Sequence, residues 1–301
     1  MKVNYNKIPA KIIKGKNREI AVFSTEGENI DHSVVEDFGE EWLKFQAYTD
    51  DTIDKFVKEY FEILDEAIVN KDTYAIDIGC GTGRWTKFLS TRAGFVEAMD
   101  PSNAILAADN LLGNIENVRL TKAAVETIPF DAETFDFAMS VGVLHHIPDT
   151  QKAMADCVKK VKKGGYFYCY LYYNLDNRGF AFKLLFQVSN GVRKIVSALP
   201  AKLKRIVCDV LAALVYLPMV LLVRFVAFLG FKKLADKLPL SPYKNKSFFV
   251  LRNDALDRFG TKLEQRFSKQ EVIDMMKNSG LDNIVVGKNA PFYRAVGKRI
   301  T

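Results

Sequence analysis

The feature that most constrains the fold is a short apolar run that ends in closely spaced glycines. Tyr74–Ile78 has the length and composition of a buried strand, and Gly79, Gly81 and Gly83 follow it directly. Residues 84–90 are then helical in pattern. Glycine lets a backbone turn tightly and lie close to a ligand, because no Cβ intervenes. The stretch therefore predicts a strand, a ligand-binding loop and a helix in succession.

Strands and helices continue to alternate up to residue 172. The further predicted strands are Phe95–Met99, Val118–Ala123, Phe135–Ser140 and Gly165–Tyr172. The predicted helices between them are Ala104–Leu112 and Thr150–Lys160. This alternation predicts βαβ units and a parallel sheet that helices cover on both faces.

Both flanking segments add elements to this core. Apolar residues recur at helical spacing over 50–69, and residues 12–23 allow a short strand pair. Near the C-terminus, Ser268 and Glu271 form a capping signature for a helix over Ser268–Ser279. Two strands, Asn283–Val286 and Tyr293–Gly297, are expected to follow as a pair.

An acidic residue ends the second predicted strand of the alternating region. Asp100 lies about 20 residues beyond the glycine loop, where a carboxylate can accept the hydroxyls of a ribose. Asp77 precedes the loop and suits a cationic ligand better than a pyrophosphate. Glycines alone would also be consistent with a simple tight turn. Together with the strand, the helix and the acid, they favour a nucleoside ligand.

Composition excludes several classes of protein. Of 301 residues, 49% are hydrophobic and 26% charged, which is typical of a globular protein and excludes a disordered or fibrous one. The four cysteines show no paired spacing and there are three histidines, so we expect neither a disulfide framework nor a metal site. The first residues lack the apolar stretch of a secretory signal. We expect a reduced, cytoplasmic protein.

The positive charge is concentrated in one segment. Between Asp176 and Lys246 there are 13 Lys and Arg residues and 3 Asp and Glu residues, whereas the whole chain has a net charge of +7. The remainder is therefore slightly acidic. The same segment contains two long apolar helical stretches, Phe180–Leu199 and Ala201–Phe231, which Pro200 separates. The pattern predicts an acidic body with a basic, apolar insertion.

The ordered motifs resemble those of class I S-adenosylmethionine-dependent methyltransferases of the type 11 kind. The matching stretches are Ala75–Gly83, Asp100, Ile128–Phe130, Phe135–Asp136, Val141–Pro148 and Val161–Gly165. They cover about a third of the chain. Phe267–Lys298 resembles the last helix and antiparallel strand pair of that family. Phe38–Trp42 resembles a segment that precedes this domain in bacterial members often associated with surface-glycan genes.

This resemblance implies a Rossmann-like α/β fold with a seven-stranded, mostly parallel sheet and helices on both faces. It also implies an N-terminal helical cap and a helical insertion after the fifth strand. The expected parts are a cap within 1–70, a cofactor-binding core over 71–175, the insertion over 176–265 and a closing helix and strand pair over 266–301.

The resemblance also assigns residues to S-adenosylmethionine, with S-adenosylhomocysteine as the product. The expected cofactor-binding residues are Asp77, Gly79, Cys80, Gly81, Gly83, Asp100, Pro101, Val125, Glu126, Ser140 and Val141. Asp77 would lie near the methionine end, and Asp100 would bind the ribose. Many relatives place an acid at the position of Ala124 to receive the adenine amino group. Here we expect backbone groups of Val125 to serve, and the role of Glu126 stays open.

His145 and His146 are the candidate general bases. They follow the fourth predicted strand, at the carboxyl edge where open α/β sheets bind ligands, and an ordinary histidine pKa near 6.5 suits proton removal. Local packing is the alternative for each. The candidates on the acceptor side are Phe38, Trp42, Tyr172 and Tyr173. The first two form either an aromatic lid or core contacts, and the two tyrosines either border the acceptor or pack in the protein.

Three interpretations of the insertion remain open. Its helices lie on an anionic membrane surface through residues 180–246, or they bury their apolar faces as a lid or homodimer interface, or the charge binds RNA. RNA is the least favoured, because Leu, Val and Ile rather than aromatic residues alternate with the cations. A membrane span over Ile206–Phe231 would enclose two charges.

We therefore predict a methyltransferase that acts on an oxygen or nitrogen of a small molecule, a lipid-linked precursor or a glycan. An RNA methyltransferase and a non-catalytic, membrane-associated S-adenosylmethionine-binding module are the alternatives. The membrane interpretation of the insertion would place the protein peripherally at the inner face of the membrane.

Overall fold

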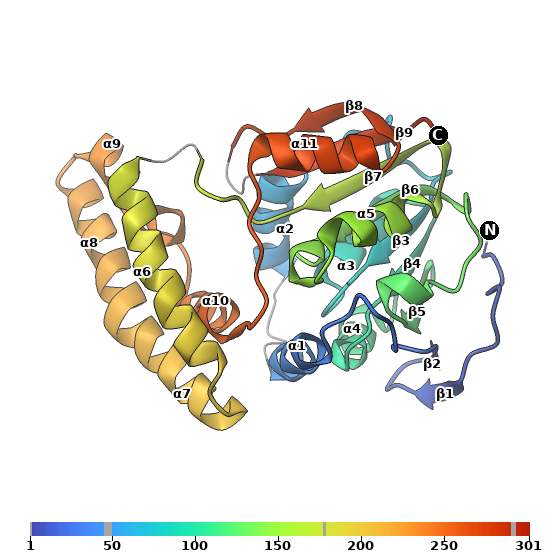
Figure 1. The fold of residues 1–301 in the computed structure, drawn as a ribbon, viewed down its shortest axis with the longest axis horizontal. Helices are drawn as coiled ribbons and strands as arrows, with labels where there is room; N and C mark the ends of the chain where they lie inside the picture. The colour runs from blue at the N-terminus through green and yellow to red at the C-terminus, as the bar shows by residue number, and fades with distance from the viewer. Residues whose placement is uncertain (1, 45–49, 177–178, 290–292) are drawn as a thin grey trace. The chain divides into compact units, whose positions relative to one another are not determined.

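The computed structural model describes residues 2–44, 50–176, 179–289 and 293–301. These residues form two compact units, coloured along the chain in Figure 1. Unit 1 contains the chain up to Asp176 and again from Leu263, and unit 2 extends from Asn177 to Lys262. The insertion expected over 176–265 thus rejoins the core three residues earlier than its expected end.

A mixed sheet forms the centre of unit 1. Its strands are β1 (Lys11–Lys14), β2 (Glu19–Val22), β3 (Tyr74–Ile78), β4 (Phe95–Met99), β5 (Val118–Lys122), β6 (Phe135–Val141), β7 (Val161–Tyr170), β8 (Leu281–Val286) and β9 (Arg294–Arg299). Their order across the sheet is β1-β2-β5-β4-β3-β6-β7-β9-β8. The strands from β2 to β7 pair in parallel, whereas β1 and β9 pair antiparallel to their neighbours.

The prediction of seven strands was wrong, because the described part of the sheet has nine. The N-terminal strand pair that the sequence allowed extends the sheet beyond β5. Ala21 and Val22 of β2 pair with Thr121 and Lys122 of β5. Burial explains this pairing: Ile20 and Val22 lose their contact with water, which stabilises β2 along the edge of β5.

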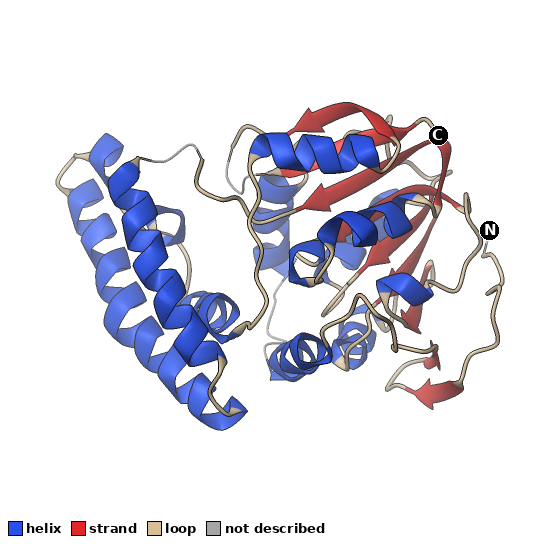
Figure 2. Cartoon of the chain, in the orientation of Figure 1, coloured by secondary structure: helices blue, strands red, loops and turns tan. Residues whose placement is uncertain are grey.

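Helices cover both faces of the sheet (Figure 2). One buried core lies between the sheet and the helices α2 (Asp50–Tyr60), α3 (Arg84–Arg92) and α4 (Ala104–Leu112). The other core lies between the sheet and the helices α5 (Thr150–Val158) and α11 (Lys269–Asn278). The helix α1 (His32–Lys44) contacts α4. The parallel strands are therefore protected from water on both sides.

The helix predicted over residues 50–69 is shorter in the structure. It ends at Tyr60, and turns follow up to Asn70. The Asp65 side chain accepts hydrogen bonds from the backbone N–H groups of Ala67 (3.0 Å) and Ile68 (3.2 Å). Such a local bond gives the backbone an alternative to helical pairing. The apolar spacing continues past Tyr60 into the segment where the Asp65 turn takes the place of helical pairing.

Unit 2 is helical throughout its described elements. These are α6 (Phe180–Ser197), α7 (Ala201–Leu211), the π-helical turn η3 (Ala212–Tyr216), α8 (Leu217–Phe228), α9 (Lys232–Ala235), the 3₁₀ turn η4 (Ser241–Tyr243) and α10 (Phe248–Gly260). The segment Ala201–Phe228 is one helix of 28 residues. Its π-helical turn ends at Tyr216, two residues before Pro218, which has no N–H and would crowd a regular turn.

Candidate active site

The site lies where the order of the sheet reverses. β3 stands between β4 and β6, so the loops after these three strands meet at the carboxyl edge of the sheet. The N–H groups of Gly79 and Cys80 both donate to the Met99 carbonyl, at 2.7 and 2.9 Å. Gly79 has a φ of +79°, and a Cβ there would lie 2.5 Å from Cγ2 of Val143. Only glycine therefore lets the loop after β3 lie against the loop after β6.

Asp77 is a buried acid with one unsatisfied oxygen. Thr86 Oγ1 donates to Asp77 Oδ2 at 2.6 Å, while Oδ1 is buried and has no hydrogen-bond partner among the described residues. Burial, with a smaller contribution from Asp100, raises the pKa of Asp77 to about 7. An unsatisfied buried oxygen is unfavourable unless a donor or a cation completes it. Asp77 therefore suits a positively charged ligand.

Asp100 is held in a fixed orientation at the end of β4. Its Oδ1 accepts hydrogen bonds from the backbone N–H (2.8 Å) and Oγ (2.6 Å) of Ser102. Its Oδ2 accepts one from the N–H of Gly81 at 2.9 Å, which joins the acid to the glycine loop. A carboxylate has about four acceptor positions, so Oδ2 keeps one for a ligand hydroxyl.

The region expected to lie beside adenine forms a single 3₁₀ turn, η1 (Val125–Thr127). Both carboxylate oxygens of Glu126 have partners: Lys152 Nζ lies 2.6 Å from Oε1, and the N–H of Asn29 lies 2.9 Å from Oε2. The Lys152 ammonium lowers the pKa of Glu126. Glu126 thus ties η1 to α5 and to the chain before α1, and the role of the Val125 backbone at the adenine stays a prediction.

Other predicted cofactor residues shape the site without offering reactive groups. The Ser140 hydroxyl is buried and donates to the Ile78 carbonyl at 3.0 Å, which joins β6 to β3. Burial, with a contribution from Asp100, raises the pKa of the Cys80 thiol well above its usual value, so the thiol stays protonated. Pro101 is half-buried directly after Asp100, and the buried Val141 ends β6.

The two histidines lie on one 3₁₀ turn, η2 (Leu144–His146), but differ in their surroundings. His146 Nδ1 lies 2.8 Å from the Leu263 carbonyl, so the neutral ring carries its proton on Nδ1 and Nε2 is an acceptor. Both ring nitrogens of His145 are buried without a hydrogen-bond partner among the described residues. Burial, together with His146 and Arg266, lowers the pKa of His145 well below its usual value. His146 is therefore the better placed base.

A strap over residues 263–267 borders the histidines and was not predicted from the sequence. The N–H of Gln265 donates to the His145 carbonyl at 3.0 Å, and the N–H of Phe267 donates to the Tyr172 carbonyl at 2.9 Å. The strap brings Arg266 to within 5.0 Å of the centre of the Tyr172 ring. The residues of the strap are Leu, Glu, Gln, Arg and Phe, which do not alternate between apolar and polar, so no local pattern identifies an extended segment.

The structure places the four acceptor-side candidates in two groups. The Phe38 ring lies 4.9 Å from that of His146, and the Trp42 ring lies 3.9 Å from where a Cβ on Gly81 would stand. Tyr172 stacks on His145, with ring centres 3.9 Å apart. Tyr173 instead packs against the edge of Tyr293, at 5.9 Å. Phe38 and Tyr172 thus contact the histidines and Trp42 lies beside the glycine loop, whereas Tyr173 contacts Tyr293 and pairs through its backbone with Phe267 of the strap.

Comparison with known proteins agrees with this geometry. Residues 76–169 match the family model described as a methyltransferase domain. The ubiquinone biosynthesis O-methyltransferase of Coxiella burnetii is 26% identical over 119 residues, which are 39% of this chain and 49% of that protein. The demethylmenaquinone methyltransferase of Staphylococcus aureus is 31% identical over 111 residues, which are 36% and 46% of the two chains. The chain spans about half the length of these curated relatives.

The fold also has counterparts among solved structures. Human N-acetylserotonin methyltransferase in complex with S-adenosylmethionine has a TM-score of 0.50 and 12% identity to this chain, with 88% of this chain and 57% of that chain covered. At this identity the likeness concerns the fold alone. The family model and the curated relatives together show a methyltransferase domain over residues 76–169, and they support the resemblance to class I S-adenosylmethionine-dependent methyltransferases.

Proposed function

We propose that this protein transfers a methyl group from S-adenosylmethionine to an oxygen or nitrogen atom of a small molecule. The observation that carries the proposal is the buried, unsatisfied Oδ1 of Asp77, next to a glycine loop that Asp100 holds in place. The names of the relatives, a ubiquinone biosynthesis O-methyltransferase and a demethylmenaquinone methyltransferase, support a small-molecule acceptor. Within this proposal the acceptor can also be a lipid-linked precursor or a glycan.

The residues present fit the cofactor. S-adenosylmethionine supplies a methyl group on a positively charged sulfonium. The Asp77 carboxylate would attract the positive charge of the methionine end and complete its own hydrogen bonding. Asp100 would accept a ribose hydroxyl through Oδ2, and the Val125 backbone would border the adenine. Correct alignment of the reacting groups can account for roughly 7–11 kcal/mol of the barrier.

His146 would remove the proton that a hydroxyl acceptor must lose. Its Nε2 is the acceptor nitrogen because Nδ1 donates to the Leu263 carbonyl. Tyr172, stacked on His145 beside His146, and Phe38, against His146, would border the acceptor. An amine acceptor depends less on a general base than a hydroxyl acceptor does, so the contribution of His146 to the rate depends on the atom that is methylated.

The test uses purified full-length protein, methyl-labelled S-adenosylmethionine and an extract of a strain that lacks the protein. We expect label in the small-molecule or lipid fraction, and calorimetric binding of S-adenosylhomocysteine. Label that is lost from the product on nuclease treatment would contradict a small-molecule acceptor. If the protein binds the cofactor but methylates no fraction of the extract, it is a cofactor-binding module, and the proposal that it is an enzyme would be contradicted.

A further inference from the structure

The long helix of unit 2 has an apolar row that faces outward. Its buried row consists of Lys204, Cys208, Ala212, Tyr216, Val220 and Val223. A second row is exposed and consists of Ile206, Val210, Leu214, Leu221, Phe225 and Phe228. The side chains of Leu214 and Phe228 are 71% and 86% exposed. A surface helix in water normally shows polar residues outward, so this row, called here the apolar face, requires an explanation.

The adjacent helix α6 extends the apolar surface of unit 2. Leu184, Val188 and Ile195 recur along it at helical spacing and are 55%, 61% and 71% exposed. α6 contacts α7 and runs alongside the long helix in Figure 1. Both helices therefore carry large hydrophobic side chains that the described residues of the chain leave exposed to solvent.

Positive charge accompanies this apolar surface. Residues 177–262 contain 16 Lys and Arg residues and 4 Asp and Glu residues, a net charge of +12. Exposed cations lie near both ends of the long helix, Lys202 at its start and Lys232 and Lys233 just beyond its end. An apolar row with cations at both ends matches a partner that is apolar inside and anionic at its surface.

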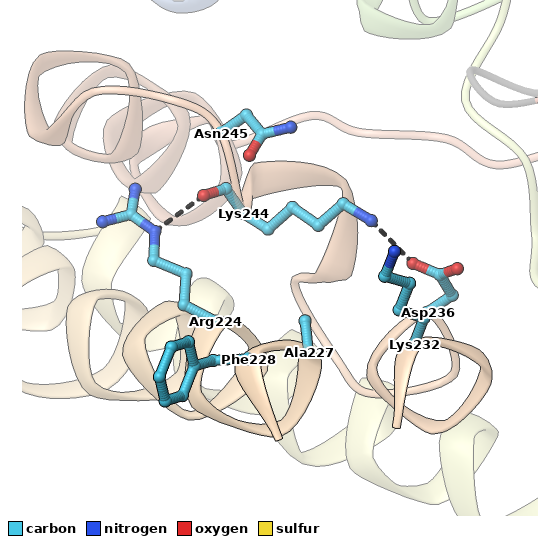
Figure 3. Close-up of a pocket in the computed structure, with 7 residues that line it drawn as sticks. All are labelled: Arg224, Ala227, Phe228, Lys232, Asp236, Lys244 and Asn245. Atoms are coloured by element: carbon cyan, nitrogen blue, oxygen red, sulfur yellow. Dashed lines mark hydrogen bonds and ion pairs between the residues drawn. The ribbon is translucent and has the colours of Figure 1, made fainter. Parts of the chain in front are cut away.

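A basic cleft of about 390 Å³ opens at the C-terminal end of α8 (Figure 3). Arg224, Lys232 and Lys244 line it together with the single acid Asp236, which pairs with Lys244 at 2.8 Å. The Arg224 Nε donates to the Lys244 carbonyl at 2.7 Å, which fixes the guanidinium at the cleft. Arg224 and Lys232 have no acidic partner among the described residues. The cleft therefore suits a phosphate group.

We propose that unit 2 docks on an anionic membrane, with the apolar face in the lipid interface and the cleft on the phosphate of an anionic lipid. Phe228 connects the two parts, because it lines the cleft and is also a member of the apolar face. Arg224 lies one turn before Phe228 on the same side of α8. Each Lys or Arg near such a surface strengthens binding about fivefold.

In this proposal the long helix of unit 2, Ala201–Phe228, lies on the membrane surface and does not cross the bilayer. By length and composition Ala201–Phe228 is able to cross a bilayer. Its inner side, however, contacts α10 along α7 and η3, and Arg252 of α10 holds Asp209 through two bonds of 2.8 and 2.7 Å. Lys204 is buried on that side as well. A crossing would carry these charges into hydrocarbon, which is costly.

The test is sedimentation of the full-length protein with vesicles. Vesicles of phosphatidylcholine with about 30% phosphatidylglycerol are compared with vesicles of phosphatidylcholine alone. We expect at least tenfold stronger binding to the anionic vesicles and a marked loss at about 0.5 M salt, where charges are screened. Equal binding to both vesicles, or no binding to either, would overturn the proposal.

Two double variants separate the two parts of the surface. Arg224→Gln with Lys232→Gln should weaken binding to anionic vesicles about 30-fold. Phe225→Ser with Phe228→Ser should weaken binding to both kinds of vesicle. The matched control is the double variant Lys163→Gln with Lys288→Gln, which removes two exposed cations of unit 1. It should bind vesicles like the parent protein. If the control variant loses as much binding as the cleft variant, the loss reflects the total charge of the protein. That result would overturn the assignment of the cleft as the phosphate site.

The same experiment distinguishes two other partners that could bind this surface, a second copy of the chain and RNA. Light scattering reports the oligomeric state of each variant. If the parent protein binds no vesicle and is a dimer, and if the double variant Phe225→Ser with Phe228→Ser is a monomer, the apolar face would be assigned to a second copy of the chain. Tight binding of RNA without vesicle binding would assign the cations to nucleic acid. Either result would overturn membrane docking.

Discussion

At the scale of single residues, the proposed function assigns different roles to two groups. Asp77 is buried beside the glycine loop with Oδ1 unsatisfied, and His146 has its acceptor nitrogen set by the Leu263 carbonyl. The first group suits the cofactor and the second the acceptor. Substitutions at the two positions should therefore alter different measured quantities.

Cofactor affinity should depend on pH through Asp77. Below its pKa of about 7 the carboxyl group is protonated and must release a proton before it can attract a cation. We expect the affinity for S-adenosylmethionine to fall up to tenfold for each pH unit below 7 and to level off above it. Calorimetry between pH 5.5 and 8 would measure this. Asp77→Asn should bind weakly with little pH dependence, whereas the exposed control Asp72→Asn should keep the parent profile.

His146→Ala should reduce turnover without weakening cofactor binding. A general base contributes about 10²–10⁴-fold, so for a hydroxyl acceptor kcat should fall within that range. The Kd of S-adenosylhomocysteine should change by less than about threefold. His32→Ala is the control, since that imidazole is half exposed. An unchanged kcat in the His146 variant would remove this residue from the mechanism.

At the scale of elements, the local patterns predicted most of unit 1. The strand, glycine loop and helix around Gly79 were predictable because each depends on residues close in sequence. The capping signature of Ser268 and Glu271 likewise predicted α11, and the structure confirms both of its bonds. These elements required no knowledge of distant contacts.

The elements that were missed depend on distant partners or on competing turns. The strap over 263–267 is extended because its backbone bonds to His145 and Tyr172, which are far away in sequence. α10 begins at the N-cap Ser247, which no prediction included, and α2 ends at Tyr60 within an apolar repeat that continues to the Asp65 turn. The pairing of β2 with β5 also joins segments about a hundred residues apart, and no local pattern specifies it.

The α11 cap can be tested as an isolated element. Ser268 Oγ accepts the N–H of Glu271 at 3.2 Å, and Glu271 Oε2 accepts the N–H of Ser268 at 2.6 Å. Ser268→Ala should lower the free energy of unfolding by about 1 kcal/mol, as measured by urea denaturation. Ser268→Asp retains an acceptor and should stay within about 0.5 kcal/mol of the parent. Equal losses in the two variants would contradict a capping role.

At the scale of the whole molecule, contacts between distant segments join the N-terminus to the sheet. Arg119 of β5 makes two bonds of 2.7 Å to the buried Glu97 of β4 and a third, also 2.7 Å, to the Val3 carbonyl. The Tyr5 ring lies 4.1 Å from the Arg119 guanidinium carbon. One buried ion pair thus connects two strands and the segment that leads to β1.

Removing one member of this pair should destabilise the protein strongly. Glu97→Ala leaves Arg119 without its buried partner, and the free energy of unfolding should fall by about 3–5 kcal/mol. Urea denaturation would measure the loss. The double variant Glu97→Leu with Arg119→Met removes both charges and should recover part of it. A loss below about 1 kcal/mol in Glu97→Ala would show that the pair contributes little.

The hydrogen bond between His146 and Leu263 places one of its partners next to the insertion. Leu263 is the first residue of unit 1 after unit 2, so the carbonyl that sets the tautomer of His146 belongs to the residue that directly follows Lys262. An exchange or deletion of the insertion must therefore keep Leu263 in place if His146 is to keep this hydrogen bond.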